Sequence, residues 1–431
     1  MSAVAERAGA GWRATTAHGV LVARRRSRQD AGLLALSALL LAVTVLLALV
    51  VPRVVLRMAD QGAQQAVRDA GPTADVVATI GSALGTAEGR QDNAATLVAN
   101  GATGMAAALP PTLGAVTGAP VTAVQSPSAT ITTTAGLVAT RLVHVGYGAP
   151  LRAGAAAPET VRWVTGLEPR TSPEPDAGTS PGAVPSDEHP RLVEVGVSAA
   201  AAEHLGIAVG DRFTLKGPSR GAVEVVVTGL YQPLDAGSPL WAAHPDLLDQ
   251  VATSSAAAAV GRVALLLSDA SLPDMLLGMQ PSAVSTTFRF PAEPDHLSAT
   301  DTGTIQRAVA RLVADPTTLT GSDGFTPVVT TELGTVLHAA DARLLASTAQ
   351  ASVLLIGLAV VGALALVLAA RLLVVRRETF LLAERARGAS VASVALRALV
   401  ESVPLVVLAA AVGALGAWLL EPDARGSWAV A

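Results

Sequence analysis

The sequence ASVLLIGLAVVGALALVLAA fills Ala351–Ala370 without a charged residue, and VPLVVLAAAVGALGAWLL fills Val403–Leu420. Between them lies a short basic insert, RRETFLLAERARGAS, which covers Arg376–Ser390. About 20 apolar residues that rise about 1.5 Å each cover the hydrocarbon core of a bilayer, which is about 30 Å thick. The two stretches therefore predict two membrane-spanning helices, joined by a tight loop on one membrane face. Such a loop is too small to be an enzyme but large enough to dock one.

A third apolar stretch, Ala31–Val51, lies near the N-terminus and is also free of charge. The alternative for all three stretches is a set of buried helices in a soluble protein, and such helices usually carry a polar stripe. These stretches hold few polar residues, namely Ser37, Thr44 and Ser352. We therefore expect membrane insertion.

The N-terminal stretch, Ala31–Val51, could also belong to a cleavable signal peptide. It is too long for a typical signal core, and about 30 residues precede it. Pro52-Arg53 follows it, where a cleaved precursor would carry a small-x-small site. We predict an uncleaved anchor, and we number the spans one (31–51), two (351–370) and three (399–420).

Arginines flank the predicted spans and set the expected orientation, because loops rich in Lys and Arg stay on the cytoplasmic side. One cluster precedes span one and another follows span two, so an even number of crossings separates them. We therefore expect a multi-pass protein of the bacterial plasma membrane. Residues 1–30 and 371–398 should be cytoplasmic, and residues 53–345 and the tail 421–431 extracytoplasmic. The clusters are Arg24, Arg25, Arg26 and Arg28, then Arg371, Arg376, Arg377, Arg385, Arg387 and Arg397.

The composition excludes several classes of function. The chain is 51% hydrophobic and 3% aromatic, and its net charge of −4 is small. Its basic residues gather beside the apolar stretches instead of forming a nucleic-acid-binding stripe, so we expect no nucleic-acid partner. The sequence has no cysteine, which excludes disulfides, thiol catalysis and cysteine-based zinc sites.

Helical patterns flank the long middle section. Arg53–Ala70 has apolar residues at helical spacing and ends at Gly71-Pro72, and Glu332–Gln350 runs into span two without a breaker. Both predict helices that continue outward from the membrane, residues 53–70 and 332–350. Together they would form a stalk for a domain at residues 71–331.

That domain has the pattern of a mixed α/β fold, since segments rich in Val, Ile and Thr alternate with Ala-rich helical segments. The Pro-rich segment, residues 168–190, should be a loop or a disordered excursion. The expected strands are Ala74–Ile80, Val121–Thr134, Leu137–Val145, Val161–Gly166 and Val263–Leu267, and the expected helices are Asn93–Leu109, Pro245–Thr253 and Ser298–Ala314.

One compact unit within it is especially clear: RLVEVGVSAAAAEHLGIAVGDRFTL, Arg191–Leu215, followed by VEVVVTGLY, Val223–Tyr231. The pattern predicts a strand, a helix over residues 198–205, turns at Gly206 and Gly210, and then two strands joined as a hairpin. Ser198 is a fitting N-cap for the helix.

No motif indicates catalysis. Two GxSxG matches occur, at Gly178–Gly182 and Gly217–Gly221, but a nucleophilic serine requires a sharp strand-to-helix elbow. The first lies in the Pro-rich segment, where Pro181 removes an N–H that an oxyanion hole needs, and the second joins two predicted strands. The seven histidines show no HxxxH or HxH pair, no P-loop motif occurs, and Lys216 is the sole lysine. We predict no catalytic residue, no cofactor and no metal site.

The insert carries the remaining charged positions of interest. Its simple interpretation is an interfacial helix whose arginines snorkel to the membrane surface. The functional interpretation is a docking element for a cytoplasmic partner, with apolar contacts flanked by guiding charges and Gly388 as the helix stop. The apolar residues are Phe380, Leu381 and Leu382, and the charges around them are Arg376, Arg377, Glu378, Glu384, Arg385 and Arg387.

The insert resembles the loop after the second span of FtsX-like ABC permeases, the superfamily of MacB and the lipoprotein exporters. In that family basic residues and a Glu precede a Leu-rich run that ends in Arg-Ala-x-Gly-Ala-Ser. The compact unit Arg191–Tyr231 is similar to the core of the family's extracytoplasmic domain, and the long outer section between spans one and two also matches. The matched insert residues are Glu378, Leu381, Leu382, Arg385, Ala386, Gly388, Ala389 and Ser390.

The resemblance implies an α-helical membrane domain with three spans, stalk helices and an inserted α/β domain of the MacB periplasmic-core type. It also implies a separate cytoplasmic ABC ATPase that docks on the insert, and mechanotransmission toward export or activation of an outside partner. Family members have a fourth span and some carry a second copy of the unit, whereas this chain ends at Ala431. We therefore expect a half-length or truncated member that acts with a second copy or a second permease half.

Two other functions are compatible with the pattern. One is a membrane-anchored sensor or receptor with an extracytoplasmic ligand-binding domain, which should continue from span two into a cytoplasmic signalling helix. The other is a membrane-anchored hydrolase or adhesin, for which no active site is evident. The presence of span three favours the permease.

Overall fold

The computed structural model describes residues 31–81, 90–148, 160–172, 190–252, 261–320, 326–386 and 391–420. The chain divides into two compact units. One comprises residues 1–61 and 342–431 and is called the membrane unit below. The other, Gly62–Asp341, is called the α/β unit.

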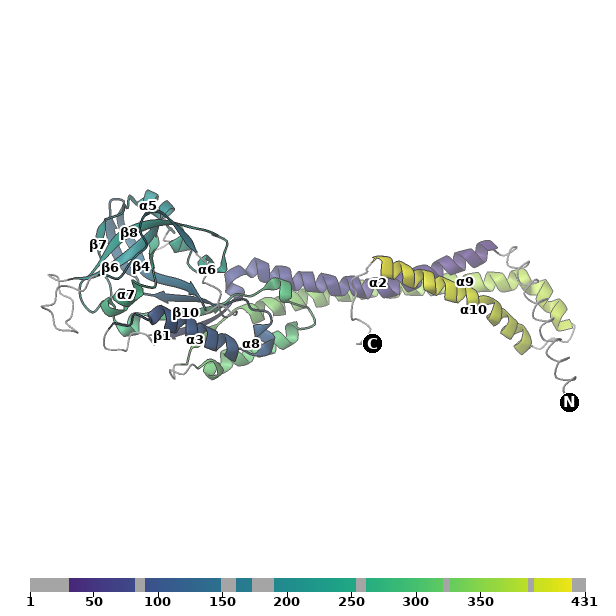
Figure 1. Cartoon of the computed structure of the whole chain (residues 1–431). Coiled ribbons are helices and arrows are strands. Elements are labelled where there is room, and N and C mark those ends of the chain that lie inside the picture. Colours follow the sequence, from purple (N-terminus) through teal and green to yellow (C-terminus); the bar gives the residue numbers. More distant parts are fainter. Residues whose placement is uncertain are drawn as a thin grey trace, which may run out of the picture. The chain divides into compact units, whose positions relative to one another are not determined.

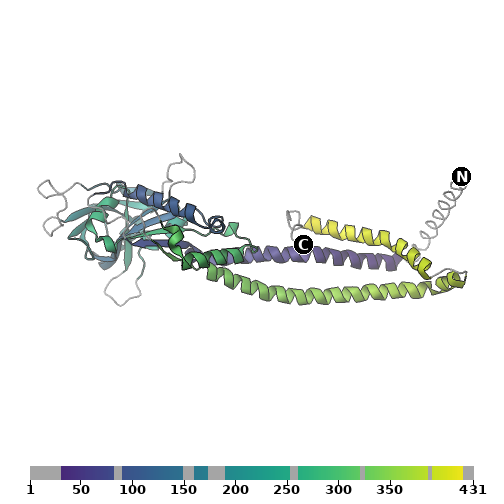
Figure 2. The ribbon, with the colours of Figure 1, turned by 90° about the horizontal axis from the view of Figure 1, so that it is seen from below.

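Three helices in the described residues are long and apolar enough to cross a membrane, as predicted. They are α2 (Ala31–Ala70), α9 (Leu333–Ala386) and α10 (Val391–Leu420), and they are the long helices in Figure 2. The helices expected at residues 53–70 and 332–350 are continuous with the apolar segments. Helix α2 passes through Pro52 and ends before Gly71, and α9 has no break between Leu333 and Ala386.

The insert between the second and third apolar stretches is helical over its described residues. Helix α9 continues through Arg376–Ala386, and α10 begins at Val391. The described residues of the segment 371–398 are therefore helical, and its expected place on the cytoplasmic side between spans two and three stays a prediction. The sequence explains the helix, since RRETFLLAERA contains no Gly or Pro and consists mostly of good helix formers. The predicted helix stop, Gly388, lies outside the described residues.

Within the membrane unit α10 packs closely on α2, and Figure 2 shows the two helices side by side. A Cβ atom placed on Gly413 would lie 2.6 Å from the carbonyl oxygen of Ala42 and 3.0 Å from Cβ of Val45. The small residues one turn away on either side, Ala409 and Ala417, are also buried. Small residues let membrane helices approach closely, because side-chain packing and not water exclusion drives their association.

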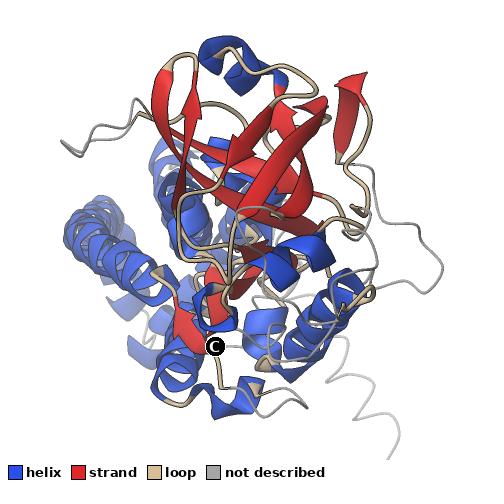
Figure 3. Cartoon of the chain, turned by 90° about the vertical axis from the view of Figure 1, so that its left-hand side faces the viewer, coloured by secondary structure: helices blue, strands red, loops and turns tan. Residues whose placement is uncertain are grey.

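The α/β unit is built on one mixed sheet with the strand order β11-β1-β10-β2-β4-β9-β6-β8-β5; β3 also pairs with β4, and β7 with β8. Its mixed α/β class was predicted. Figures 1 and 3 show the strands and the helices around them. The strands are β1 (Val76–Gly81), β2 (Val121–Gln125), β3 (Ala129–Thr133), β4 (Gly136–Tyr147), β5 (Val161–Gly166), β6 (Arg191–Ser198), β7 (Arg212–Thr214), β8 (Val223–Pro233), β9 (Arg262–Leu267), β10 (Ser285–Phe290) and β11 (Val328–Thr330).

Helices and 3₁₀ turns connect these strands. The α-helices are α3 (Ala94–Ala108), α4 (Pro111–Gly114), α5 (Ala199–Leu205), α6 (Pro239–Ala242), α7 (Leu272–Gly278) and α8 (Thr302–Ala314). The 3₁₀ turns are η1 (Gly71–Ala74), η2 (Pro245–Leu247), η3 (Pro281–Ala283), η4 (Pro294–His296) and η5 (Pro316–Leu319).

One part of the sheet has a recognisable topology. The segments β1-α3-β2 and β10-α8-β11 form two βαβ halves, and their strands lie in the order β11-β1-β10-β2 with every neighbouring pair antiparallel. This is the split βαβ arrangement. The chain between β2 and β10 is an insertion that extends the same sheet from β4 to β5.

The compact unit predicted from residue 191 onward is confirmed in detail. Ser198 caps α5 by accepting a hydrogen bond from the N–H of Ala201 at 3.1 Å. Gly206 ends the helix with φ 66°, and Gly210 turns the chain with φ 97°. Both angles lie in the left-handed region that glycine tolerates best. Strand β7 then pairs antiparallel with β8, as the predicted hairpin requires.

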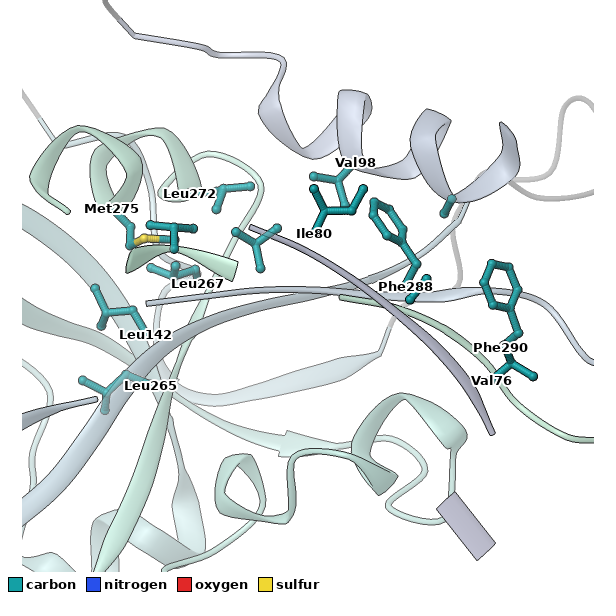
Figure 4. Packing of buried hydrophobic residues seen from close by; sticks show 14 of the residues in the cluster. Val76, Ile80, Val98, Leu142, Leu265, Leu267, Leu272, Met275, Phe288 and Phe290 are labelled. Atoms are coloured by element: carbon teal, nitrogen blue, oxygen red, sulfur yellow. The ribbon is translucent and has the colours of Figure 1, made fainter. Parts of the chain in front are cut away.

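The main core lies between the sheet and a layer that includes α3 and α7. In Figure 4, Val98 of α3 faces Ile80 of β1 and Phe288 of β10. Strand β9 divides its residues between two cores, because successive side chains point to opposite faces of a sheet. Leu265 and Leu267 enter the main core, whereas Leu266 enters a second core on the other face.

The second core depends on a bulge in β8. Its pairing with β6 shifts at Thr228, so Val227 faces the main core whereas Tyr231 faces the second. A bulge of this kind inserts one unpaired residue and reverses the facing of those that follow. The ring of Tyr231 contacts Trp163 edge-on at 5.8 Å and stacks on Trp241 at 6.2 Å, measured between ring centroids.

Several sequence-based boundaries need correction. The expected strand Val121–Thr134 is two strands, separated at Ser126-Pro127-Ser128 because Pro127 cannot donate to a ladder. Of the expected helix Pro245–Thr253, which the structure describes up to residue 252, only η2 is helical in the described part, and α8 begins at Thr302 instead of Ser298. Strands β10 and β11 were not predicted. The Pro-rich segment lies largely outside the described residues.

Two glycines create the slot that holds Trp163. A Cβ atom on Gly196 would lie 2.6 Å from the Trp163 ring, and one on Gly229 would lie equally close. We expect Gly196→Ala to lower the free energy of unfolding by about 1–3 kcal/mol, because the added methyl overpacks the slot. Denaturant titration of the full chain in detergent, with hydrogen exchange read in β6 and β8, measures the loss.

The control for that substitution is Gly104→Ala in α3. Open space surrounds Gly104, and alanine is the better helix former, so this variant should gain about 0.5–1 kcal/mol. Equal effects of the two substitutions would contradict the glycine slot.

Candidate functional site

The described part of the insert presents one exposed stripe on α9. Glu378, Leu382 and Ala386 follow each other at four-residue spacing, so they share one face of the helix. All three are exposed, and Leu382 exposes 58% of its surface. Arg376 is also exposed. An exposed leucine between a carboxylate and the helix end can serve as an apolar contact for a partner.

The other predicted docking residues are placed less completely. Arg377, Phe380, Leu381 and Arg385 belong to the helical backbone of α9, but their side chains lie outside the described part of the structure. Arg387 and Gly388 lie outside the described residues altogether. The structure therefore places seven of the nine predicted docking residues on α9, describes the exposure of Arg376, Glu378 and Leu382, and leaves the docking role itself as a prediction.

The start of α9 is anchored firmly within the α/β unit. Leu333 and Leu337 are fully buried in the main core, and burying a leucine contributes about 1.5–3 kcal/mol. The carboxylate of Asp341 accepts hydrogen bonds from Thr302 Oγ1 at 3.1 Å and Gln306 Nε2 at 2.7 Å, both on α8. Hydrogen bonds to a charged group contribute about 1.5–3 kcal/mol each. This anchor therefore combines apolar packing with charge-assisted bonds.

The end of α2 is anchored more weakly in the same unit. Ala63 and Val67 are buried, and Gln64 Nε2 donates to the carbonyl oxygen of Leu297 at 3.1 Å. Arg68 pairs with Asp295, but the two side chains are 45% and 83% exposed. Exposed ion pairs contribute about 0–1 kcal/mol. Small buried side chains and a solvated ion pair hold α2 less tightly than two buried leucines hold α9.

A buried ionic network fastens η2 to the sheet. Arg141 of β4 makes two hydrogen bonds to Asp246, Nε to Oδ2 at 3.0 Å and Nη2 to Oδ1 at 2.9 Å. Its third donor, Nη1, reaches Gln125 at 2.7 Å, and Arg262 lies 3.4 Å from Asp246. Asp246 is fully buried. Planar bidentate pairing satisfies the carboxylate geometrically, as a buried charge requires.

His244 belongs to this network as a neutral acceptor. Its Nδ1 atom lies 3.2 Å from Nη2 of Arg141. Burial, followed by the positive charge of Arg141, lowers the pKa of His244 to about 4, while Asp246 acts in the opposite direction. The neutral tautomer with its proton on Nε2 leaves Nδ1 free to accept from the guanidinium.

Two further polar clusters hold the α/β unit together. Arg90 pairs with the buried Asp274 of α7, whose Oδ2 also accepts from the N–H of Ser172 at 3.0 Å. Asp75 accepts from the N–H of Ala292 at 2.9 Å and lies 3.3 Å from Nη1 of Arg289. Burial raises the pKa of Asp75 despite these partners. Both clusters join distant segments, which is a structural role.

The residues weighed for catalysis do not assemble a reactive site. Ser219, in the second GxSxG match, lies between β7 and β8, and its hydroxyl donates to Gly221 O at 2.6 Å. The first match lies outside the described residues. His144 pairs with Asp269 at 2.7 Å. Among the described residues no group of three His, Asp or Glu side chains could hold a metal ion.

Sequence reasoning missed the anchor at Asp341 and the network around Asp246. Asp341 lies 39 residues from Thr302 and Asp246 lies 105 from Arg141. No spacing rule links residues so far apart. A single carboxylate among other polar residues of a segment carries no such signal without the fold.

No family model and no curated protein sequence matches this chain.

The neutral state of His244 predicts acid sensitivity. Its pKa is about 4 in the folded chain and about 6.5 when unfolded, so the unfolded state binds the proton more readily. The contribution of neutral His244 to the free energy of unfolding is complete above about pH 6.5 and is lost as the pH falls toward 4. It amounts to about 3 kcal/mol. Denaturant titrations of the full chain in detergent between pH 7 and pH 4 measure this slope.

His244→Asn tests the assignment, because the Asn Oδ1 atom can accept from Arg141 but cannot be protonated in this range. We expect a shallower fall of stability with acid in this variant than in the native chain. Parallel profiles for the two proteins would contradict the role of His244.

Proposed function

We propose that the chain is the membrane subunit of an FtsX/MacB-like ABC system, which couples a separate cytoplasmic ATPase to an extracytoplasmic α/β domain. The observation that carries this proposal is the continuity of α9. A single helix contains both the buried anchor Leu333–Asp341 and the exposed insert residues up to Ala386. Its 54 residues extend about 80 Å at about 1.5 Å per residue, far more than the bilayer core of about 30 Å.

A continuous helix is a suitable element for transmitting motion. Its backbone hydrogen bonds run along the axis, and interrupting them requires the costly nucleation of a new turn. Displacement at the insert would therefore reach the far end of α9 without being absorbed by a hinge. In this proposal Arg376, Glu378 and Leu382 belong to the contact with the ATPase, together with the other predicted docking residues.

The orientation rests on the two arginine clusters. Both lie on the same side if α2 and α9 each cross the bilayer once, and that side should be the cytoplasm. The insert then meets a cytoplasmic ATPase, and the α/β unit lies outside. The partner would be a second copy of the chain or a second permease half. The assembled system would export a substrate or activate a protein outside the membrane.

The sensor alternative receives less support. A receptor would continue from its second span into a cytoplasmic signalling helix. Here α9 is followed, after four residues, by another helix long and apolar enough to cross a membrane. The packing of Gly413 on Ala42 joins that helix to α2. A membrane unit of packed helices suits a permease better than a receptor that ends its membrane part at the second span.

Single cysteines can test the topology, because the chain has none of its own. Ala236→Cys lies on an exposed turn of the α/β unit, and Ala386→Cys lies on the exposed stripe of the insert. We expect a membrane-impermeant maleimide to label position 236 in intact spheroplasts and position 386 only after lysis. Labelling of position 386 before lysis would contradict the proposed orientation.

Replacing Phe380, Leu381 and Leu382 together by serine tests the docking role. We expect co-purification with an ABC ATPase subunit to fall by at least about 100-fold, because three apolar contacts each contribute more than about 1 kcal/mol at an interface. Quantitative pull-down from membranes, with the ATPase identified by mass spectrometry, measures the loss.

The matched control changes three exposed apolar residues of the α/β unit, Leu97, Val164 and Leu234, to serine. This variant should retain the ATPase, and both variants should reach the membrane in equal amounts. Undiminished recovery of the ATPase with the insert variant would refute the docking role.

A further inference from the structure

One short segment of the α/β unit, Pro294–Gln306, is held by both long helices. It comprises the turn η4, a connecting stretch and the first turn of α8. The end of α2 binds its first part, through Arg68 to Asp295 and Gln64 to Leu297. The start of α9 binds its second part, through Asp341. We name this segment the double-anchored segment.

Asp341 makes the second attachment in a specific way. Its two carboxylate oxygens serve two different side chains, Oδ1 accepting from Thr302 and Oδ2 from Gln306. The single hydroxyl proton of Thr302 is shared between Asp341 and the carbonyl oxygen of Ala299, which lies 3.0 Å away. A negative charge beside the first turn of α8 also complements the partial positive charge of that helix terminus. Asp341 therefore fixes α8 to α9 by charge as well as by geometry.

The two attachments lie close together in the sequence. Leu297, which α2 holds, and Thr302, which α9 holds, are five positions apart. A segment of that length spans at most about 18 Å when fully extended. Both of its ends are buried, Leu297 at 3% exposure and Thr302 at 4%. Sliding of α2 against α9 by one helical turn, about 5.4 Å, must therefore deform this segment or break one of its attachments.

The segment also leads directly into the main core. Helix α8 buries Ile305, Val309 and Leu312 there. Gly334 of α9 faces Val309, since a Cβ on Gly334 would lie 3.4 Å from its Cγ1 atom. A displaced α8 cannot leave its packed position without disturbing the sheet beneath it, because close-packed interiors transmit strain.

We propose that the double-anchored segment is where relative movement of α2 and α9 is converted into displacement of α8, with Asp341 as its positioning residue. The inference rests on the proposed coupling function, but its consequence is measurable without an ATPase. A restraint between α2 and α9 in the membrane unit changes the mobility of the segment. Loss of Asp341 removes that response.

A disulfide supplies the restraint. A Cβ atom on Gly362 of α9 would lie 3.6 Å from Oγ1 of Thr44 on α2, which is within the reach of a disulfide between these positions. The full chain carrying Thr44→Cys and Gly362→Cys is reconstituted in nanodiscs. Hydrogen exchange at residues 294–306 is then compared between the oxidised and the reduced form.

We expect exchange at residues 294–306 to slow at least about threefold on oxidation, because the restraint suppresses opening of the segment. Helix α5, outside the path, should exchange equally in both forms. Oxidant added to either single-cysteine chain should have no effect. Unchanged exchange at residues 294–306 in the cross-linked protein would overturn the proposal.

The role of Asp341 has a separate readout. Asp341→Ala in the same double-cysteine chain should abolish the difference between oxidised and reduced forms. Thr302→Val with Gln306→Leu removes the two donors from the other side and should have the same effect. Unaltered exchange in α5 and β6 shows that these variants fold. A redox-dependent difference that persists in both variants would exclude Asp341 as the positioning residue, whatever becomes of the ATPase.

Discussion

The unbroken backbone of α9 is the constraint on which the rest of this structure depends. In hydrocarbon a segment that spans by itself must pair its own backbone N–H and C=O groups, which an α-helix does. No helix-breaking residue follows the apolar stretch before Ala386. RRETFLLAERA contains neither glycine nor proline, and the helix continues through it. At the other end, Leu333 and Leu337 bury themselves in the main core. One element thus combines a segment long and apolar enough to cross a bilayer with an end that is buried in the core of the α/β unit.

The α/β unit meets a different constraint, because the inserted part of its sheet is covered on both faces. Leu265 and Leu266 are neighbours in the chain and enter opposite cores. Strand β8 supplies both cores through its bulge, which lets Val227 and Tyr231 face in opposite directions. Gly196 and Gly229 then leave room for Trp163 over the strands. With only 3% aromatic residues in the chain, much of its aromatic packing is concentrated at this point.

Local signals explain what the sequence could predict. The apolar runs, the Ser198 cap and the turns at Gly206 and Gly210 each act over a few residues, and the structure contains all of them. Strand β10 was missed because its partners are far away: Phe288 pairs with Ala78 on one side and Thr122 on the other. Strand β11, with three residues, is too short for an alternation to be visible. The break at Pro127 was a local signal that we passed over.

The docking residues of the insert stay a prediction, whereas its backbone is described by the structure up to Ala386. Its charges and leucines predicted a docking element, and Glu378 and Leu382 do lie exposed on a common face. The helix expected to stop at Gly388 is continuous with α9, which begins at Leu333 and is described to Ala386. That continuity matters physically. A loop can adapt to a partner without moving anything else, whereas in the proposed function a contact made on α9 would act on the helix whose other end carries Asp341. The carboxylate of Asp341, bound to Thr302 and Gln306, holds that end of the helix against α8.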